Sequence, residues 1–529
     1  LLENCKTNDL TSRNTVFLFL GPAISEISED PRKWWTEAQE QLRDSLSQKI
    51  NTNKAKNVIL FIGDGMGVST VTAARILKGQ LRNRSGEESI LEFEKFPYVA
   101  LSKTYVTDRQ VSDSAATATA ILSGIKTKWQ HIGVDGTNGS EDCSVDARIE
   151  TILDWSQTEG KSTGIVTNSR ITHATPAALY AHVPNRNWES DTSLPNSTKC
   201  RDIAYQLIHE NNDIQVLFGG GRSKFLPDTE ADIEKGGSTQ KYHRRDGLNL
   251  IHNWETIIQK RGGRYKFLCN NTDFDTLDPN NVDYVLGLFE SNHMQYELER
   301  DRGPSGEPSL EQMTKKAIQI LQRNNNGFFL LVEGGRIDHA HHDSKAKKAL
   351  YETLALDEAI KTAVELTKEE ETLIVVTADH SHVFNIAGYP NRGNDILGIV
   401  DPPKKWYPMD NKPYTTLLYA NGPGWSEVRQ DPRTVDTTDD NYIQISAVPL
   451  SQETHGGEDV AIYARGPMSH LFHGVKEQHY IAHVMAYASC VGANQNHCKG
   501  ITNSSYKITN TKFNLFGLFI MFLYKTLIH

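Results

Sequence analysis

Acidic and histidine side chains are concentrated directly after three short apolar runs of this 529-residue chain. The runs are residues 57–62, 328–332 and 372–377. The side chains that follow them are Asp64, then Glu333, Asp338, His339, His341 and His342, and finally Asp379, His380 and His382. One such turn, or one His-rich helix start, is common on protein surfaces, but three together are hard to explain as turns. Mixed carboxylate and imidazole ligands are typical of zinc, and carboxylate with hydroxyl favours magnesium.

The spacing of these residues limits which of them can share an ion. Asp338 and His342 are four residues apart, so on a helix they lie on one face and can hold a single ion. Asp379 and His380 are adjacent and can reach one ion only at an irregular strand end. Spacing alone does not assign the ligands to particular ions.

Ser114 is the candidate nucleophile, because it precedes a run of good helix formers at residues 115–122. A helix N-terminus presents free N–H groups and a positive dipole, which suit a phosphoryl group. The competing interpretation is that Ser114 only caps the helix. Without a Gly-x-Ser-x-Gly sequence around it, a metal ion is a better activator of this hydroxyl than a catalytic triad.

The elements that must position these residues alternate along the chain. Apolar runs at 57–62, 163–167, 216–218, 328–332 and 372–377 indicate buried strands, and helical patterns such as 310–322 and 346–366 lie between them. This order predicts an α/β fold with a central, mostly parallel β-sheet and helices on both faces. If the sheet is open, its ligands bind beyond the carboxyl ends of the strands.

Residues 388–450 differ in composition, since Pro, Gly, Asp and Tyr dominate and helical periodicity disappears. Short strands such as 414–419 are expected there. The segment is too long for an ordinary loop, so we interpret it as an inserted small subdomain. Residues 26–387 and 451–500 would then form one catalytic α/β domain.

Both ends carry the pattern of a targeting signal. Residues 1–25 have the form of a leader, with Arg13 before an apolar run and a small-x-small sequence at 23–25. Residues 503–529 have the order of a GPI-anchor signal, with an apolar tail after a polar spacer. A membrane helix is the alternative, but the apolar run is shorter than a span needs. The candidate attachment residues are Asn503, Ser504 and Ser505. We therefore expect a GPI-anchored protein at the outer face of the plasma membrane.

Cysteines and glycosylation sequons agree with the secretory pathway. Cys490 and Cys498 can close a small loop, and Cys143 and Cys200 a larger one. Five N-x-S/T sequons place candidate glycans at Asn83, Asn138, Asn196, Asn270 and Asn503. The formal net charge of −10 argues against nucleic acid as a partner.

Five motifs in order resemble those of the animal alkaline phosphatases, including the tissue-nonspecific, intestinal and placental forms. They are Gly63 to Gly67, Asp113 to Ala120, Val332 to His342, Thr377 to His382 and Glu453 to Asp459. The likeness extends from about Trp34 to Cys498, most of the chain. It implies hydrolysis of phosphate monoesters at alkaline pH through a phosphoserine, with two zinc ions and one magnesium ion per chain.

The resemblance also implies a role for each matching residue. Ser114 would be the nucleophile and Arg186 would grip two phosphate oxygens. One zinc would be held by Asp338, His342 and His455. The other zinc would be held by Asp64, Ser114, Asp379 and His380. Magnesium would take Asp64, Thr175 and Glu333, with His173 in its outer shell, while His382 would lie nearby without an assigned ligand role. The same family pattern supports both cysteine pairs and the GPI tail.

A calcium site and a homodimer are further implications of the resemblance. The expected calcium ligands are Glu234, Phe289, Glu290 and Glu307, although Glu307 stands where relatives have Asp. Residues 388–450 correspond to the family's crown subdomain at the dimer interface, and Tyr389 matches a tyrosine that reaches the neighbouring active site. The crown sequence departs strongly from the family, so substrate preference is not implied.

Other functions of the same fold compete with this interpretation. Cofactor-independent phosphoglycerate mutases, phosphodiesterases and sulfatases share the sheet and a metal site. Phosphodiesterases usually offer Thr as the nucleophile and lack an equivalent of Arg186, and the sulfatase motif is absent. A non-catalytic surface protein for adhesion, or an antigen, is the alternative from a different class. Zinc content would distinguish it from the enzyme.

Overall fold

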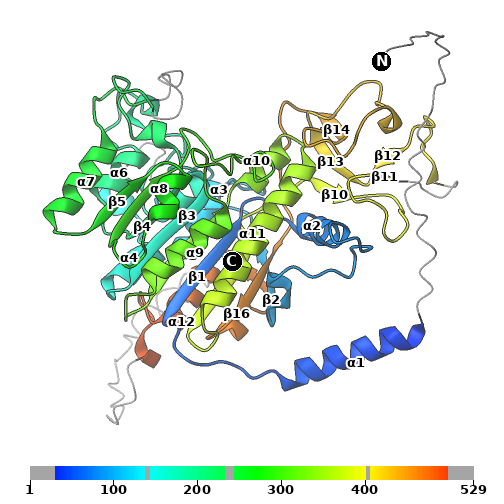
Figure 1. The fold of residues 1–529 in the computed structure, drawn as a ribbon, viewed down its shortest axis with the longest axis horizontal. Helices are drawn as coiled ribbons and strands as arrows, with labels where there is room; N and C mark the ends of the chain where they lie inside the picture. The colour runs from blue at the N-terminus through cyan, green and yellow to red at the C-terminus, as the bar shows by residue number, and fades with distance from the viewer. Residues whose placement is uncertain (1–29, 138–142, 233–242, 401–405, 499–529) are drawn as a thin grey trace, which may run out of the picture.

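A ten-stranded β-sheet forms the centre of the computed structural model, which describes residues 30–137, 143–232, 243–400 and 406–498 (Figure 1). In spatial order its strands are β17 (Gly474–Glu477), β2 (Tyr98–Lys103), β16 (Val460–Arg465), β8 (Thr372–Ala378), β1 (Asn57–Gly63), β7 (Phe328–Gly334), β3 (Ser162–Arg170), β4 (Val216–Gly220), β6 (Tyr284–Leu288) and β5 (Tyr265–Leu268). Neighbouring strands pair in parallel except where β16 pairs antiparallel with β8 and β2. The predicted α/β fold is confirmed, and the five predicted strands are among the ten.

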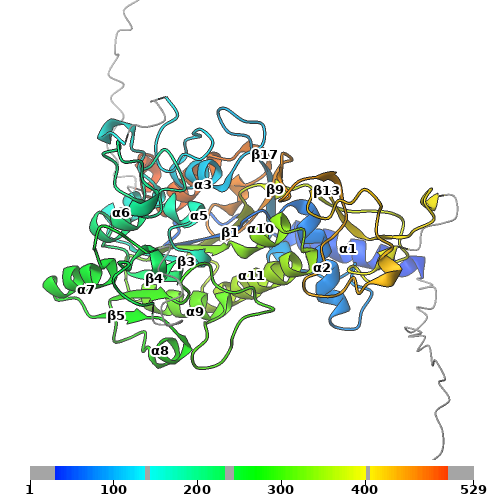
Figure 2. The same cartoon turned by 90° about the horizontal axis from the view of Figure 1, so that it is seen from above.

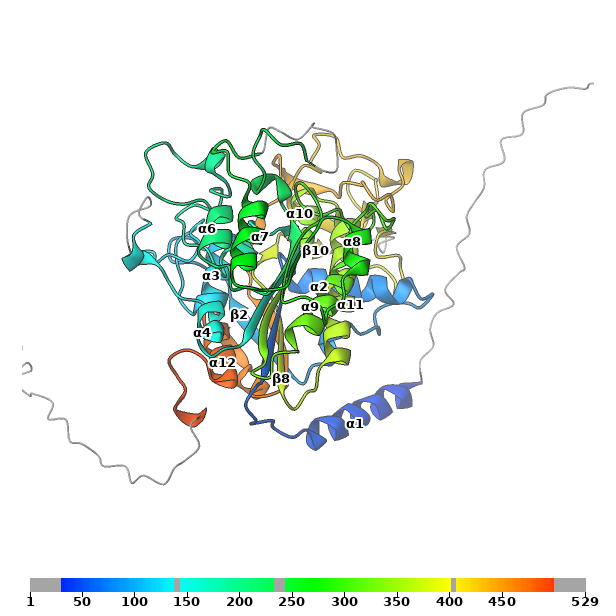
Figure 3. The same ribbon diagram turned by 60° about the vertical axis from the view of Figure 1, so that its left-hand side comes forward.

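Helices cover both faces of the sheet, as the nearly edge-on view of Figure 3 shows. One face carries α3 (Ser114–Ser123), α4 (Ile152–Thr158), α5 (Ala174–Ala177), α6 (Ile203–His209), α7 (Leu250–Lys260) and α12 (Tyr480–Ser489). The other carries α2 (Val68–Gln80), α8 (Asn271–Thr276), α9 (Leu310–Leu321), α10 (Arg336–His342) and α11 (Ala346–Leu366). The predicted helices at 310–322 and 346–366 correspond to α9 and α11.

The side chains of β1 show why its sequence is apolar throughout. Leu60 and Ile62 pack into one hydrophobic core, and Ile59 and Phe61 pack into the core on the opposite face. Successive side chains of a strand point to opposite faces, so a strand covered by helices on both sides needs apolar residues at every position. All seven residues of β1 are buried.

Short strands in and beside residues 388–450 form small separate sheets at the upper right of Figure 1. One contains β10 (Phe384–Ile386), β13 (Leu417–Gly422) and β14 (Ser446–Pro449), and another pairs β11 (Ile399–Val400) with β12 (Tyr414–Thr415). The predicted strand at 414–419 is divided between β12 and β13. A third pair, β9 (Ser381–His382) and β15 (His455–Gly456), lies at the candidate site.

Helix α1 (Pro31–Ser47) lies apart from the rest of the fold in Figures 1 and 3. None of its 17 residues is buried against the part of the chain that the structure describes. The side chains of Trp34 and Trp35 are 50% and 68% exposed. Within the described ranges, no helix has both the length and the apolar character to cross a membrane.

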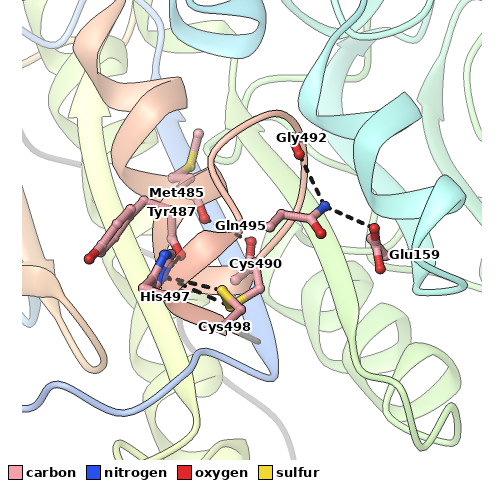
Figure 4. Close-up of a disulfide and its surroundings, with 9 residues drawn as sticks. Glu159, Met485, Tyr487, Cys490, Gly492, Gln495, His497 and Cys498 are labelled. Atoms are coloured by element: carbon pink, nitrogen blue, oxygen red, sulfur yellow. Dashed lines mark hydrogen bonds between the residues drawn. A yellow bond between two sulfur atoms is a disulfide. The ribbon is translucent and has the colours of Figure 1, made fainter. Parts of the chain in front are cut away.

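Both predicted cysteine pairs are disulfides in the structure, Cys143–Cys200 and Cys490–Cys498. Figure 4 shows the second beside His497, which stacks on Tyr487 with ring centroids 3.7 Å apart. The candidate glycan sites Asn83 and Asn196 are exposed and Asn270 is half-buried. The leader, the GPI-signal segment and the sequons at 138 and 503 lie outside the described residues.

Candidate active site

The three acidic strand ends meet because β8, β1 and β7 are neighbours in the sheet and are paired in register. Asp64 and Asp379 each follow the last residue of a strand, and Glu333 is the next-to-last residue of β7. All three carboxylates are fully buried. Figure 2 shows that α3, α5, α10 and β9 surround this end of β1. The structure confirms the prediction that these carboxylates lie together at one edge of the sheet.

Ser114 is the first residue of α3, and its hydroxyl faces these side chains. Its Oγ lies 3.2 Å from Nε2 of His380 and 3.4 Å from Oδ1 of Asp64. The residue that caps the helix is Asp113, whose side chain accepts from the N–H of Ala116. The alternative that Ser114 only caps the helix is therefore wrong, because its neighbour occupies the cap position and leaves its hydroxyl turned to the acidic cluster.

Asp379 is held in place by three hydrogen bonds. Its Oδ1 accepts from the N–H groups of Gly65 at 3.0 Å and His380 at 2.9 Å, and its Oδ2 accepts from the Thr117 hydroxyl at 3.2 Å. Gly65 has a φ of +71°, a left-handed conformation that favours glycine, and a Cβ there would collide with the imidazole of His382. The Gly-Asp-Gly turn thus lets the backbone approach the site closely.

Asp338 lies at the centre of a second cluster. Its Oδ1 is 2.8 Å from Nε2 of His382, 3.2 Å from Nε2 of His455 and 3.3 Å from Nε2 of His342. The helix α10 brings Asp338 and His342 onto one face, as their spacing predicts, and β15 pairs with β9 to bring His455 beside His382. His382, which had no assigned role, is as close to Asp338 as the expected ligands are.

A third group surrounds Glu333, close to Asp64. The Glu333 carboxylate accepts from the hydroxyls of Thr167 at 2.5 Å and Ser169 at 3.0 Å. Ligand atoms of Asp64, His173 and Glu333 lie within 4.8 Å of one another. Thr175 is fully buried, in α5.

Arg186 lies over the opening of the site, between two partners. Its Nη1 donates to Oδ2 of Asp113 at 3.1 Å, and its Nη2 lies 3.1 Å from Nε2 of His173. A cavity of about 560 Å³ opens here, lined by Ser114, Arg186 and other residues. Asp113 therefore connects the arginine to the start of α3.

The side chains present suit divalent cations. Burial, followed by the charges of Asp379, Asp338 and Glu333, raises the pKa of Asp64 well above its ordinary value. Its Oδ2 is buried without a hydrogen-bond partner among the residues that the structure describes. Burial also raises the pKa of Asp379. Buried carboxylates this close together are stable as anions only when cations compensate them. Aspartate and histidine ligands beside Ser114 and Asp338 fit zinc, and the carboxylate–hydroxyl group at Glu333 fits a harder cation.

Glu333 should make the stability of the metal-free protein depend on pH. Burial raises its pKa to about 7 from 4.5, so the folded chain binds this proton more tightly than the unfolded chain. We expect its contribution to the free energy of unfolding to fall as pH rises from about 4.5 to about 7. Added Mg²⁺ should then raise the Tm more at pH 8, where the carboxylate is charged, than at pH 5.

Thermal unfolding of chelator-treated protein, with and without Mg²⁺ at both pH values, measures this effect. Glu333→Gln, which cannot ionise, is the control and should lose most of the Mg²⁺ effect. An equal Mg²⁺ effect in both proteins would show that the ion does not act at Glu333.

Glu453 is a site residue to which sequence reasoning gave no role. Its Oε2 lies 2.5 Å from Nδ1 of His382 and its Oε1 accepts from the N–H of Val383 at 2.7 Å. Although burial acts in the opposite direction, Glu453 and Asp338 together raise the pKa of His382 to about 10. The sequence offered one signal for Glu453, its position two residues before the expected ligand His455. Its contact with His382 depends on the pairing of β9 with β15.

A cluster of three histidines beside the cavity was also missed. His293 lies with its ring centroid 5.2 Å from that of His173 and 4.1 Å from that of His339. Burial lowers the pKa of all three, and neighbouring arginines and histidines lower it further. Guanidinium groups of Arg170, Arg186 and Arg336 each approach one of the rings. These neutral rings accept from arginines, which makes the cluster a poor place for a cation.

The expected calcium ligands are only partly described. Gln295 connects two of them, since its Nε2 donates to Glu290 at 3.0 Å and its N–H donates to Glu307 at 2.7 Å. Phe289 precedes Glu290 and packs its ring into the core. Glu234 lies outside the described residues, so the calcium site stays a prediction.

The site combines a serine hydroxyl, buried side chains that suit metal ions, and an arginine that lines the same open cavity. This combination suits phosphoryl transfer and defines the class of protein as a metal-dependent phosphohydrolase. The alkaline phosphatase family matches residues 55–491. The chain belongs to this family. It is accordingly a phosphoric monoester hydrolase. This assignment replaces the mutase, diesterase, sulfatase and non-catalytic alternatives.

Curated relatives are similar over nearly the whole chain. The human tissue-nonspecific alkaline phosphatase is 52% identical over 492 residues, which cover 90% of this chain and 91% of the human protein. A membrane-bound alkaline phosphatase of the silkworm Bombyx mori is 44% identical, covering 88% of this chain and 86% of that protein.

Solved structures agree in fold. The alkaline phosphatase of the Antarctic bacterium TAB5 superposes with a TM-score of 0.58 at 24% identity, covering 84% of this chain and all of that one. The Thermus thermophilus enzyme has a TM-score of 0.60 at 21% identity, covering 85% and 94%.

Proposed function

We propose that Ser114 is the nucleophile of this phosphatase and carries the phosphoryl group as a phosphoserine. The Ser114 hydroxyl gives its proton to water, its Oγ forms a bond to phosphorus, and the bond from phosphorus to the leaving-group oxygen breaks, so that the leaving group takes a proton from water and departs as an alcohol. A water molecule then attacks the phosphoserine and releases inorganic phosphate, which restores the hydroxyl. Two in-line displacements retain the configuration at phosphorus.

Arg186 would hold two oxygens of the phosphoryl group through its planar fork. In the structure its two terminal nitrogens contact Asp113 and His173 on opposite sides. Asp113 is thus a positioning residue, because one carboxylate both caps the nucleophile helix and orients the arginine.

The residues that would hold the cations are Asp338, His342 and His455 for one zinc ion, Asp64, Ser114, Asp379 and His380 for the other, and Asp64, Thr175 and Glu333 for magnesium. When bound, these cations would neutralise charge on the attacking and leaving oxygens and make hydroxide available near neutral pH. The chain's own part is to gather the ligands at one sheet edge and exclude water from Asp64, Glu333 and Asp379, which are fully buried.

One observation carries this proposal: the Ser114 Oγ lies within 3.4 Å of both His380 and Asp64, in the cavity that Arg186 lines. The test is to incubate the metal-loaded enzyme with inorganic phosphate at acidic pH, where dephosphorylation is slow, and to map phosphopeptides by mass spectrometry. Phosphate on Ser114 is expected. Phosphate on another residue, with Ser114 unmodified, would contradict the assignment.

Location at the cell surface through a GPI anchor is part of the same proposal. The silkworm relative is described as membrane-bound, and the tail pattern at 503–529 supplies a means of attachment. Release of activity from intact cells by a phosphatidylinositol-specific phospholipase tests this. Activity that stays with the membrane would favour a spanning helix instead.

We also propose a homodimer, with residues 388–450 as a crown at the interface. Tyr389 is 63% exposed, with its ring centroid 5.7 Å from that of Trp406, so it is available to a second chain. The exposed apolar side chains of α1 support the same idea, because a helix with no buried residue needs a partner surface. Sedimentation velocity should give about twice the mass of one mature chain.

A further inference from the structure

Glu352 is a buried carboxylate of α11 that the proposed mechanism does not use. Its two oxygens accept from different parts of the chain. Oε1 accepts from the N–H of Glu297 at 2.6 Å, and Oε2 accepts from the Asn168 amide at 2.8 Å. Burial raises the pKa of Glu352 to about 7, although the two hydrogen bonds and the charge of Arg336 act in the opposite direction. At alkaline pH it is therefore an anion, and an ionised carboxylate can only accept hydrogen bonds.

The Asn168 side chain connects this carboxylate to the start of α10. Its Nδ2 donates to Glu352, and its Oδ1 accepts at 3.2 Å from the N–H of Arg336, the first residue of the helix. Because the carboxylate only accepts, it holds the amide with the nitrogen toward Glu352 and the oxygen toward the helix. The reverse orientation would place an amide N–H group against the N–H of Arg336.

Helix α10 needs this acceptor because it has no cap of its own. Its cap position is Gly335, which has no side chain to accept from the first turn. A Cβ at Gly335 would lie 2.9 Å from the Cβ of Ser169 and 3.1 Å from the carboxyl carbon of Glu333, so a serine or aspartate cap does not fit. Asn168, on the neighbouring strand β3, supplies the acceptor instead. The third residue of this helix is Asp338.

We propose that Glu352 is a positioning residue of the active site: it orients Asn168, Asn168 caps α10, and the capped helix holds Asp338 in place for its cation. This inference rests on the proposed role of Asp338 as a zinc ligand and adds two residues that act on it through the helix. Residues that orient metal ligands typically change metal affinity about 10- to 100-fold when they are replaced. Loss of the cap should therefore weaken zinc retention.

Glu352→Gln is the first variant, because it keeps the size of the side chain but replaces two acceptors with one acceptor and one donor. With the new oxygen on the N–H of Glu297, the new amide nitrogen faces Asn168. Asn168 must then turn and leave the N–H of Arg336 without its acceptor. At pH 9 we expect a chelator to remove zinc about tenfold faster than from the wild type. Amide hydrogen exchange in residues 336–342 should also be faster.

The rescue variant combines Glu352→Gln with Asn168→Asp. The introduced carboxylate accepts both from the introduced amide and from the N–H of Arg336, so each donor regains an acceptor. Zinc release and hydrogen exchange should return to within about threefold of the wild type. Asn168→Asp alone should be impaired, because it places two carboxylates against each other. Glu358→Gln is the matched control in the same helix, since Glu358 is 51% exposed at its side chain and lies 3.8 Å from Lys361.

Two results would overturn the proposal. If Glu352→Gln releases zinc at the wild-type rate, Glu352 does not position the ligand. If the double variant is no better than Glu352→Gln, the buried charge matters and the orientation of Asn168 does not. Should Glu352→Gln not fold by itself, the same comparison is made on the yield of folded, zinc-containing protein, which Asn168→Asp should restore.

Zinc analysis of Asp338→Asn separates these results from failure of the proposed function. Full zinc content in Asp338→Asn would remove Asp338 from the ligands and so contradict the proposed site. Loss of zinc from Asp338→Asn, with normal zinc release from Glu352→Gln, would contradict the positioning role alone.

Discussion

Replacing Ser114 with alanine is expected to lower kcat for phosphate monoesters by about 10³-fold or more. The substitution removes one oxygen, which lies 3.2 Å from Nε2 of His380 and 3.4 Å from Oδ1 of Asp64, and leaves the helix cap at Asp113 intact. The fold should therefore be unchanged, and the loss should appear in turnover. The measurement is steady-state hydrolysis of an aryl phosphate, with zinc content determined for the same samples.

Ser112→Ala is the control for this variant. Ser112 lies two residues away, also lines the cavity, and donates its hydroxyl only to the carbonyl of Asp113 among the described contacts. Its own carbonyl, which faces Nδ1 of His455 at 2.7 Å, is kept in the alanine variant. We expect this control to remain within a few-fold of the wild type. A Ser114→Ala enzyme that keeps more than a tenth of its activity would remove Ser114 from the mechanism.

Replacing Asp338 with asparagine is expected to lower kcat/KM by about 10²-fold or more, with the loss of about one zinc ion per chain. The change preserves shape but removes the charge at the centre of the His342, His382 and His455 cluster. His342, His382 and His455 are what keep the pKa of Asp338 well below its ordinary value in spite of burial. Without that charge, the proposed zinc loses a carboxylate ligand, and His382 keeps only Glu453 as the anionic partner that raises its pKa.

Asp343→Asn, at the C-cap of the same helix, is the matched control. Asp343 is 44% exposed at its side chain and contacts Lys345 at 3.2 Å, away from the cluster. It should keep its zinc and its activity. Metal analysis of both proteins after gel filtration, together with kcat/KM, gives the comparison. If Asp338→Asn keeps full zinc content and only its turnover falls, Asp338 orients histidines and is not a ligand.

The order of the elements could be predicted from the sequence because each depends on local pattern. The apolar runs at β1, β7 and β8 and the periodic segments at α9 and α11 need no distant information to be recognised. The carboxylates after those strands could also be placed at one sheet edge, because parallel strands present their carboxyl ends together. What local pattern left open was strand order, and with it the neighbour of each acidic residue.

The side chains around Ser114 also show what local sequence pattern cannot predict. A serine before a helix-forming run is equally compatible with a cap and with a nucleophile. The tertiary structure distinguishes the two, because Asp113 caps α3 and the Ser114 hydroxyl points to His380 and Asp64. No short-range signal contains that contact, since His380 is 266 residues away in the chain.

The sequence by itself determined the α/β class, the acidic residues that follow the apolar strands, the family motifs and the two candidate cysteine pairs. Only the tertiary structure decided that Glu453 supports His382, that His293 joins an arginine-bound histidine cluster, and that Asn168 lies at the start of α10. The physical reason is that these contacts depend on how loops and short strands from distant segments close over the sheet edge. Local propensity determines which elements form, whereas packing between them determines which side chains meet.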